Sequence, residues 1–196
     1  MSTTSSWVPG AGATHLFGLH NLAYGSARVG DAPTGAGRGA QMLVVRIGDS
    51  ALQLAAACRA LLPELAPLVD SPTLNALLAS TPATWQRLRS ALVEWLGDDR
   101  RRAVLEPLLV PLDELSCRLP FEVADFVDFN ASEHHAANVG RLFRPGNDPL
   151  PAAWKHLPIA YHGRAGTVVV SGTPVRRPVG LRRRSSGGVG LGPSEQ

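Results

Sequence analysis

The stretch QMLVVRIGDSALQL, from Gln41 to Leu54, constrains the fold of this chain more than any other feature. Two short apolar runs flank Gly48-Asp49, and two turn residues that include a glycine between β-type runs are typical of a tight hairpin. The first run carries β-branched residues, and Arg46 alternates onto the opposite face. The sequence therefore predicts a β-hairpin that turns at Gly48.

Helical patterns follow the hairpin. The segment LAAACRALLPEL has a helical composition until Pro63 interrupts it. Ser71-Pro72 and Thr81-Pro82 each place a capping hydroxyl before a proline, which is how many helices begin. After the second pair, large apolar residues recur at helical spacing, with Gly97 as the stop, which predicts one face of an amphipathic helix. These residues, with both tryptophans expected in the core, are Trp85, Leu88, Leu92, Trp95 and Leu96.

The bulk composition is that of a folded protein. The chain has 196 residues, of which 44% are hydrophobic and 18% charged, so it can bury a real core. The formal net charge of +3 is modest. Much of the excess is local, because five arginines fall in the last 21 residues: Arg176, Arg177, Arg182, Arg183 and Arg184. This distribution argues against a nucleic-acid-binding surface spread over the whole body.

Membrane insertion and secretion are not expected. No stretch approaches the roughly 20 consecutive apolar residues that a membrane span needs, and the N-terminus lacks the basic start and apolar run of a signal peptide. Cys58 and Cys117 lie far apart without CxxC spacing, which is typical of reduced, structural cysteines. The sequence predicts a soluble, cytoplasmic protein without a membrane partner.

The composition becomes more polar and aromatic near Pro120, at FEVADFVDF. We place a domain boundary there, between residues 1–120 and 121–196. The second part contains one expected strand, TVVVSG (Thr167 to Gly172), followed by a tail from Pro174 to Gln196 whose composition predicts disorder. Such a short, open-ended second part indicates the front portion of a longer protein.

Titratable groups concentrate in DFVDFNASEHHAANVG, residues 125–140. Asn130 could cap a short helix, with Glu133 completing a capping box. In such a helix His134 and His135 point about 100° apart, so only one of them can face a given site. The residues alone leave two interpretations open. One is a solvated loop, and the other is a catalytic segment in which an aspartate binds a metal beside a histidine base.

A second polar group follows in LFRPGNDPLPAAWKHLPIAYHGRAG. Arginine can grip a carboxylate bidentately and a phenol can donate to an oxygen, so this group suits a carboxylate-bearing substrate. A loop held together by its own polar side chains is the alternative. The sequence contains no HExxH, no GxSxG elbow and no Walker loop. The residues of the second group are Arg144, His156, Tyr161, His162 and Arg164.

Six motifs in order resemble the fumarylacetoacetase family: LHNLAYG, VRIGDSALQL, SPTLNALL, DFVDFNASEHHAANVGRLFR, WKHLPIAYHGR and VVVSGTPVRRPVG. The resemblance implies a mainly β fold with some α. It places an N-terminal SH3-like β-barrel with added helices before the beginning of a β-rich catalytic domain, in a homodimer. It also implies hydrolysis of a carbon–carbon bond of a β-diketo acid, 4-fumarylacetoacetate. The products are fumarate and acetoacetate, in the last step of tyrosine and phenylalanine catabolism.

The resemblance also assigns individual residues. Asp128 matches the aspartate that binds a calcium or magnesium ion, and an oxygen ligand suits such a hard cation. His135 matches the histidine that activates water, so the resemblance gives the adjacent His134 no catalytic role. Arg144 and Tyr161 match substrate-contacting residues. Asn130 stands where the family usually has a substrate-contacting tyrosine, so it either alters substrate binding or serves as the helix cap.

By the same resemblance, further acidic metal ligands and other site residues belong beyond residue 196. A hard cation takes about six or more oxygen ligands, so we expect this chain alone to be inactive. Two alternatives remain. One is an inactive or altered family member, consistent with Asn130. The other is a non-catalytic binding module that uses its arginine tail on an acidic partner or nucleic acid, which leaves the titratable residues without a role.

Overall fold

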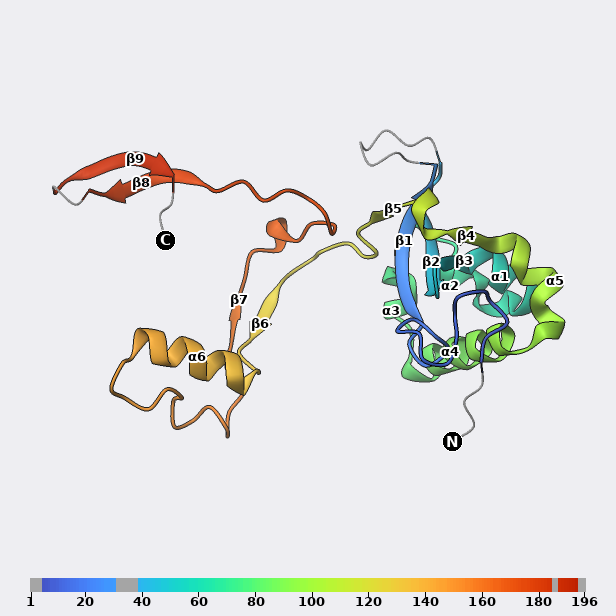
Figure 1. The fold of residues 1–196 in the computed structure, drawn as a ribbon, viewed down its shortest axis with the longest axis horizontal. Coiled ribbons are helices and arrows are strands. Elements are labelled where there is room, and N and C mark those ends of the chain that lie inside the picture. The colour runs from blue at the N-terminus through green and yellow to red at the C-terminus, as the bar shows by residue number, and fades with distance from the viewer. Residues whose placement is uncertain (1–4, 31–38, 185–186, 194–196) are drawn as a thin grey trace.

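The computed structural model describes residues 5–30, 39–184 and 187–193. In Figure 1 the chain forms two bodies that are joined by an extended connection. The first body ends with a strand at Leu115–Arg118, and the second begins with a strand at Val127–Phe129. The exact domain boundary near Pro120 stays a prediction.

The first body is built on a five-stranded antiparallel sheet that curls into a half-barrel. In spatial order its strands are β4 (Leu109–Pro111), β3 (Ser50–Gln53), β2 (Met42–Ile47), β1 (Ala23–Val29) and β5 (Leu115–Arg118). The expected class, mainly β with some α and with helices added to the sheet, is confirmed.

The predicted hairpin is confirmed. β2 and β3 pair in antiparallel register, with Ile47 opposite Ser50, so only Gly48 and Asp49 form the turn. Gly48 has φ +57°, a left-handed conformation that glycine adopts without strain. On the outer face, Arg46 places its guanidinium 3.8 Å from the centre of the Phe17 ring. The inward side chains Leu43, Val45 and Ile47 are at most 1% exposed, so β2 runs through the core.

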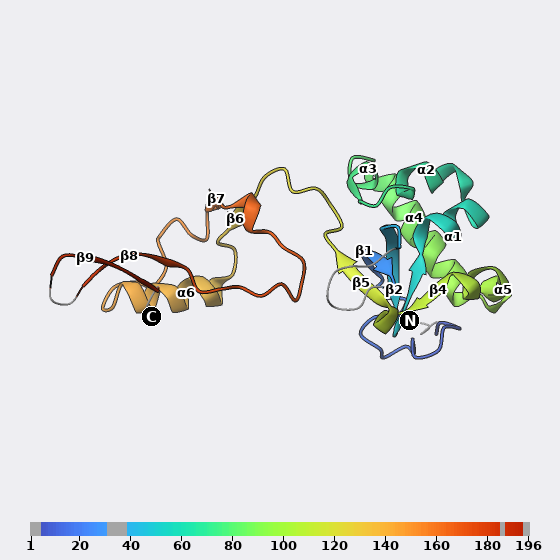
Figure 2. The same cartoon turned by 90° about the horizontal axis from the view of Figure 1, so that it is seen from above.

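Helices cover one side of the sheet, as Figure 2 shows. They are α1 (Leu54–Leu61), the 3-10 turn η1 (Pro63–Leu65), α2 (Ala66–Val69), α3 (Asn75–Leu78) and α4 (Pro82–Gly97). α1 ends just before Pro63, as predicted. The start and end of α4 are also confirmed: the Thr81 hydroxyl accepts a 3.3 Å hydrogen bond from the Thr84 N–H, and the last helical residue is Gly97.

The apolar stripe of α4 is confirmed except at its first residue. Leu88, Leu92 and Leu96 are fully buried and Trp95 is 4% exposed. Trp85 is 41% exposed, so the expectation that it lies in the core was wrong. It lies on the first turn of α4, where the single turn of α3 covers only part of its ring. Its indole N–H donates to the carbonyl of Leu77 at 2.6 Å.

The helix expected at Ser71-Pro72 does not begin there, since α3 starts at Asn75. The Ser71 hydroxyl instead accepts from the Thr73 N–H at 3.2 Å, which closes a turn. The Pro72 carbonyl accepts from the buried Ser26 hydroxyl at 2.7 Å. These contacts hold the segment in place without a helix, because a capping hydroxyl can satisfy a turn as well as a helix end.

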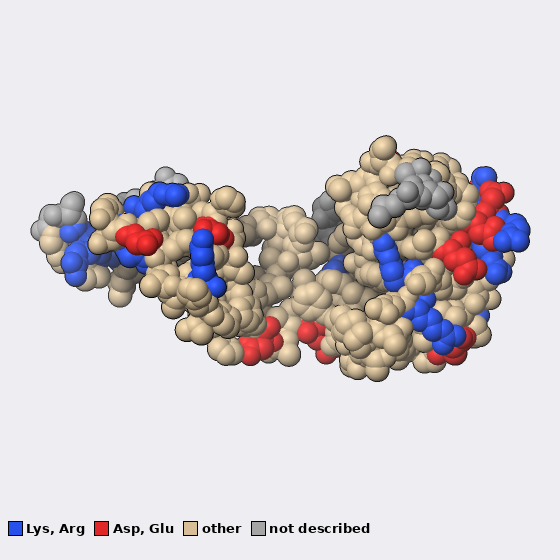
Figure 3. Space-filling view, turned by 90° about the horizontal axis from the view of Figure 1, so that it is seen from below, with Lys and Arg blue, Asp and Glu red and all other residues tan. Residues whose placement is uncertain are grey.

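Short elements complete the first body: η2 (Asp99–Arg101), α5 (Arg102–Leu105), η3 (Glu106–Leu108) and η4 (Leu112–Glu114). Exposed ion pairs join Arg100 to Asp98 at 2.9 Å and Arg102 to Glu106 at 2.8 Å. Figure 3 shows charged side chains of both signs side by side at this end of the molecule, with large uncharged areas elsewhere on the same face. Such exposed pairs contribute little stability.

The second body contains β6 (Val127–Phe129), α6 (Glu133–Phe143), β7 (Ala160–His162), the turn η5 (Ala165–Thr167), β8 (Val179–Arg183) and β9 (Val189–Pro193). The strand expected at TVVVSG was wrong. Thr167 closes η5, and residues 168–170 pair with no strand among the described residues. A run of valines needs a neighbouring strand to become one.

The disorder expected from Pro174 onward was also wrong for the described part of the tail. β8 and β9 form an antiparallel hairpin in which Leu181 lies opposite Leu191. Gly187 and Gly188, just before β9, both have positive φ, which lets the chain reverse. Residues 185–186 and 194–196 lie outside the described residues.

The two cysteines are unpaired, with Cys58 buried and Cys117 exposed. Within the described ranges, no helix combines the length and apolar character needed to cross a membrane.

Candidate active site

The β6–β7 ribbon places the first two predicted site residues together. Asp128 lies directly opposite Tyr161 in the antiparallel register, so their side chains share one face of the ribbon. The Tyr161 hydroxyl donates a 2.8 Å hydrogen bond to Oδ2 of Asp128. This hydrogen bond, together with the negative charge of Asp128, raises the pKa of Tyr161. The phenol therefore stays neutral and can donate through the physiological pH range.

Asn130 follows β6 and lies in the connection to α6, not at the helix cap. Its backbone N–H donates to the Ile159 carbonyl, and its carbonyl accepts from the Trp154 indole, both at 2.9 Å. The cap is Ser132, whose hydroxyl accepts from the His135 N–H at 3.4 Å. The expected capping role of Asn130 was wrong, because these bonds hold it at the end of the ribbon, and Ser132, two residues later, caps the helix.

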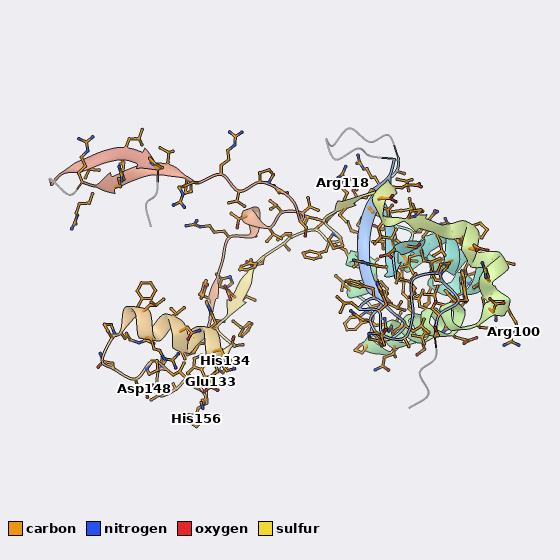
Figure 4. The ribbon with its side chains drawn as sticks, in the orientation of Figure 1. Arg100, Arg118, Glu133, His134, Asp148 and His156 are labelled. Atoms are coloured by element: carbon orange, nitrogen blue, oxygen red, sulfur yellow. The ribbon has the colours of Figure 1, made fainter. Side chains whose placement is uncertain are left out.

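Glu133 does not complete a capping box with Asn130, because its carboxylate pairs with Lys155 at 3.0 Å. Figure 4 shows Glu133 and His134 at the start of α6, next to the loop that carries His156. The two adjacent histidines separate as the helical geometry requires. His135 lines the pocket beside the ribbon, and His134 is not among its walls.

Arg144 caps the C-terminal end of α6, where its N–H donates to the Gly140 carbonyl at 2.8 Å. Its guanidinium donates to the Pro149 carbonyl at 2.6 Å. The Pro149 carbonyl in turn packs directly on Gly140, where a Cβ would overlap it. Glycine at position 140 therefore allows the loop after α6 to approach the helix and fix the arginine.

A pocket of about 420 Å³ opens between the ribbon and α6. All five residues predicted for the site lie in its walls: Asp128, Asn130, His135, Arg144 and Tyr161. The structure thus brings together residues that are up to 33 positions apart in the chain. Asp128 is partly buried and Tyr161 is 60% exposed, so the pocket is open to solvent on one side.

Sequence reasoning missed the rest of the lining. The signal was present on α6, because residues 132, 135, 136 and 139 follow helical spacing and form one face. The ribbon and the following loop supply the other walls. The additional residues are Phe129, Ala131, Ser132, Ala136, Val139, Pro151 and Ile159.

Three residues of the second polar group lie outside this pocket. His156 lines a neighbouring cavity of about 300 Å³, which also contains Lys155. His162 places Nδ1 3.5 Å from a carboxylate oxygen of Asp125. Arg164 accepts at its carbonyl from the Thr167 hydroxyl at 2.8 Å. Only Arg144 and Tyr161 of that group therefore remain candidates for the same site.

The residues present do not form a complete cation site. Asp128 is the single carboxylate in the pocket walls. Throughout the described part of the chain, no group of three or more His, Cys, Asp or Glu side chains is placed to hold a metal ion. One carboxylate falls well short of the roughly six to eight oxygen ligands of Ca²⁺.

Sequence comparison identifies the family to which this chain belongs. The family profile described as Fumarylacetoacetase N-terminal matches residues 20–120, slightly more than half of the chain. The chain belongs to the fumarylacetoacetase family. This confirms the resemblance that the motifs indicated.

Named relatives extend the similarity beyond residue 120. Fumarylacetoacetase of Bos taurus is 35% identical over 178 residues, which cover 85% of this chain and 41% of the relative. The protein of Caenorhabditis elegans is 37% identical over 169 residues, covering 77% and 38%. That of Homo sapiens is 35% identical over 175 residues, covering 84% and 40%. The chain thus spans about two fifths of the length of the curated relatives it matches.

Proposed function

We propose that this chain carries the histidine-bearing part of the active site of a fumarylacetoacetase-like hydrolase. The reaction is hydrolysis of the carbon–carbon bond of 4-fumarylacetoacetate to fumarate and acetoacetate, at the end of tyrosine and phenylalanine catabolism. One observation carries the proposal: the Asp128, Asn130, His135, Arg144 and Tyr161 side chains line one pocket of about 420 Å³. Family membership supports the hydrolase class.

Arg144 is the residue we propose to bind the substrate carboxylate. A guanidinium can donate two parallel hydrogen bonds to a carboxylate, and this one is fixed at the pocket wall by the Pro149 carbonyl. Because Arg144 and His135 line the same pocket, we propose that a substrate held by its carboxylate at Arg144 directs its keto groups towards His135.

His135 is the residue we propose as general base. It takes a proton from water, whose oxygen attacks the keto carbon and forms a bond to it. The carbon–carbon bond to the adjacent methylene then breaks, its electron pair stays on the methylene as an enolate, and a proton neutralises that carbon. Histidine suits the first step because its ordinary pKa lies close to neutral pH.

Tyr161 and Asp128 act as a pair in this proposal. The hydrogen bond from the phenol orients the Asp128 carboxylate towards the pocket. We propose that Asp128 supplies one oxygen ligand to a Ca²⁺ or Mg²⁺ ion, which would stabilise an enolate as a Lewis acid. Asp128 is the single carboxylate in the described walls of this pocket, so we propose that the remaining oxygen ligands come from the substrate, from water or from residues outside the pocket. From the same family resemblance we propose that the full-length protein is a homodimer. Its molecular mass in sedimentation equilibrium tests this.

Substrate binding is tested first with acetoacetate, one of the proposed products, followed by the backbone amide shifts of the chain in NMR. We expect saturable shifts on β6, β7 and the first turn of α6. Arg144→Gln should weaken binding by about tenfold, because it removes a charged hydrogen-bond donor. Arg164→Gln, a matched change outside the pocket, should leave binding unchanged. Equal effects of the two changes would remove Arg144 from the site.

Turnover is tested in any form of the protein that releases fumarate from 4-fumarylacetoacetate. The matched pair is His135→Ala and His134→Ala, since the two histidines are neighbours on the same turn. We expect the first change to lower turnover by roughly 100-fold or more, and the second to change it by less than about twofold. Comparable losses in both variants would contradict the role of His135.

A further inference from the structure

The loop after α6 returns to the start of that helix through two adjacent side chains. The Trp154 indole N–H donates to the Asn130 carbonyl at 2.9 Å. Next to it, the Lys155 ammonium lies 3.0 Å from Oε1 of Glu133. Asn130 precedes Ser132, the cap of α6, and Glu133 is the first residue of the helix. The two contacts therefore hold the chain on both sides of the cap.

Trp154 is itself held in place by the backbone of its loop. Its main-chain N–H donates to the Pro151 carbonyl at 2.9 Å. The N–H groups of His156 and Leu157 both donate to the Ala153 carbonyl, at 3.0 and 2.9 Å. These bonds fold the loop into turns, and the Trp154 side chain is partly buried. The indole thus reaches the helix start from a well-defined position.

The two side-chain contacts differ in strength. The side chains of Lys155 and Glu133 are 61% and 51% exposed, and an exposed ion pair contributes little. The Trp154 hydrogen bond is partly buried, where losing a partner is more costly. A cavity of about 300 Å³ is lined by both the loop and residues 129–131, so close packing does not join the two segments at that point. Trp154 is therefore the main side-chain connection between them.

The other end of α6 is held by different contacts. The Arg144 guanidinium donates to the Pro149 carbonyl, which packs on Gly140 near the C-terminal end of the helix. His135 lies in the first turn, where its N–H donates to the Ser132 hydroxyl. The two pocket residues Arg144 and His135 are therefore positioned by separate segments of the chain.

We propose that Trp154 is a positioning residue for His135, with Lys155 in a supporting role. By fixing the Asn130 carbonyl, the indole sets where α6 begins and so where the His135 imidazole lies in the pocket wall. Trp154 is not among the walls of that pocket, so it acts through the backbone. This inference rests on the role proposed for His135 as general base.

Trp154→Phe tests the proposal, because it removes the indole N–H and keeps an aromatic ring. In the chain, we expect the His135 ring-proton signals to shift in NMR. Acetoacetate affinity should change by less than about twofold, because the Arg144 contacts remain. In any form of the protein that releases fumarate, kcat should fall roughly tenfold while KM stays within about twofold, since a base displaced by about 1 Å can cost up to about 100-fold in rate.

Two further residues provide controls. Trp85→Phe removes an equivalent indole bond, to the Leu77 carbonyl at 2.6 Å in the first body, and should leave the His135 signals and kcat unchanged. Lys155→Met should shift the His135 signals in the same direction as Trp154→Phe but by less, since its ion pair is exposed. Lys155→Arg retains the charge and should restore the parent signals.

The fold of Trp154→Phe is checked by thermal unfolding and by the amide signals of α6. If that variant unfolds, Lys155→Met and Lys155→Arg decide, and equal His135 signals in these two variants would overturn the proposal. Unshifted His135 signals in a folded Trp154→Phe would also overturn it, as would a loss of acetoacetate affinity as large as the loss of kcat. Retained turnover in His135→Ala would refute the proposed function, whereas the ring signals would still report whether Trp154 positions the imidazole.

Discussion

The Tyr161 hydroxyl donates a 2.8 Å hydrogen bond to Oδ2 of Asp128, directly across the β6–β7 pair. The two residues are 33 positions apart, and the strand register alone makes them neighbours. A proposed cation ligand and a proposed substrate-contacting residue are thus coupled before any ligand binds. The pair holds one carboxylate oxygen in a fixed direction, so losing the phenol changes both roles together.

Tyr161→Phe tests this coupling. The ring remains, so the ribbon should keep its register and the melting temperature should change little. Acetoacetate should bind about fivefold more weakly, because the Asp128 carboxylate in the same pocket loses a hydrogen bond worth roughly 1 kcal/mol and repels the anionic ligand more strongly. Binding is measured by amide shifts, and the Asp128 carboxyl carbon should shift as it loses its donor. An unchanged acetoacetate affinity would show that the phenol stabilises the β6–β7 ribbon and does not contribute to ligand binding.

Gly140→Ala should weaken the same site, although Gly140 itself is not in the pocket walls. An alanine normally stabilises a helix interior by up to about 1 kcal/mol relative to glycine. Here the new Cβ would overlap the Pro149 carbonyl, which also holds the Arg144 guanidinium. We therefore expect lower stability and weaker acetoacetate binding. Thermal unfolding and the same NMR titration provide the measurements.

The control for this change is Gly166→Ala, because a Cβ there meets nothing within 4 Å. It should leave both stability and binding unaltered. If Gly140→Ala instead stabilised the protein, the loop after α6 would not pack on the helix as described.

Capping residues show where local sequence reasoning succeeds and where it fails. Thr81 caps α4 as predicted, because one hydroxyl precedes one proline at the start of a clear apolar stripe. Near α6 two capping residues, Asn130 and Ser132, are two positions apart, and local chemistry does not choose between them. The choice is made by the backbone bonds of Asn130 to Ile159 and Trp154, which are distant in sequence.

The same distinction explains the other differences. The hairpin at Gly48 and the stripe of α4 depend on neighbours within a few residues, so the sequence predicts them. The valines of residues 168–170 depend on a partner strand, and the exposure of Trp85 depends on how little of it α3 covers. The site residues came from family motifs. Their convergence on one pocket depends on the β6–β7 register, which no local pattern encodes.

Ser132→Ala and Asn130→Ala test the cap of α6. The hydrogen bond from the His135 N–H to Ser132 is lost only in the first variant. We expect Ser132→Ala to destabilise α6 by about 0.5–1 kcal/mol, seen as faster amide exchange over its first turn. Asn130→Ala should keep that exchange unchanged, because its backbone bonds remain. The reverse order of effects would return the capping role to Asn130.

Calcium and magnesium should have little effect on the chain by itself. A single carboxylate cannot hold a hard cation tightly, and stabilisation by a ligand requires a concentration above its dissociation constant. Millimolar calcium or magnesium should therefore leave the melting temperature almost unchanged, and so should EDTA. Amide shifts confined to β6 and β7 at high cation concentration would fit a lone ligand at Asp128. A large stabilisation would reveal a complete site instead.

The two cysteines differ in burial, so we expect their thiols to differ in reactivity. Cys58 is 0% exposed on α1, and burial raises the pKa of its thiol from 9.0 to about 11, against the lowering effect of Arg59. The thiolate is the reactive form, so Ellman's reagent should titrate the exposed Cys117 alone in the native protein. Both thiols should react after unfolding in urea.

The raised pKa also makes stability depend on pH in a defined direction. Below about pH 9 the Cys58 thiol is protonated in both states, so its contribution is fully present. Between about pH 9 and 11 the unfolded chain releases the proton while the native protein keeps it, so the free energy of unfolding falls as pH rises. Urea unfolding at several pH values measures this fall. Cys58→Ala should show a flatter dependence than the parent, although its cavity lowers stability throughout, and Cys117→Ala should follow the parent. Parallel curves for the parent and Cys58→Ala would mean that the Cys58 proton is not held by burial.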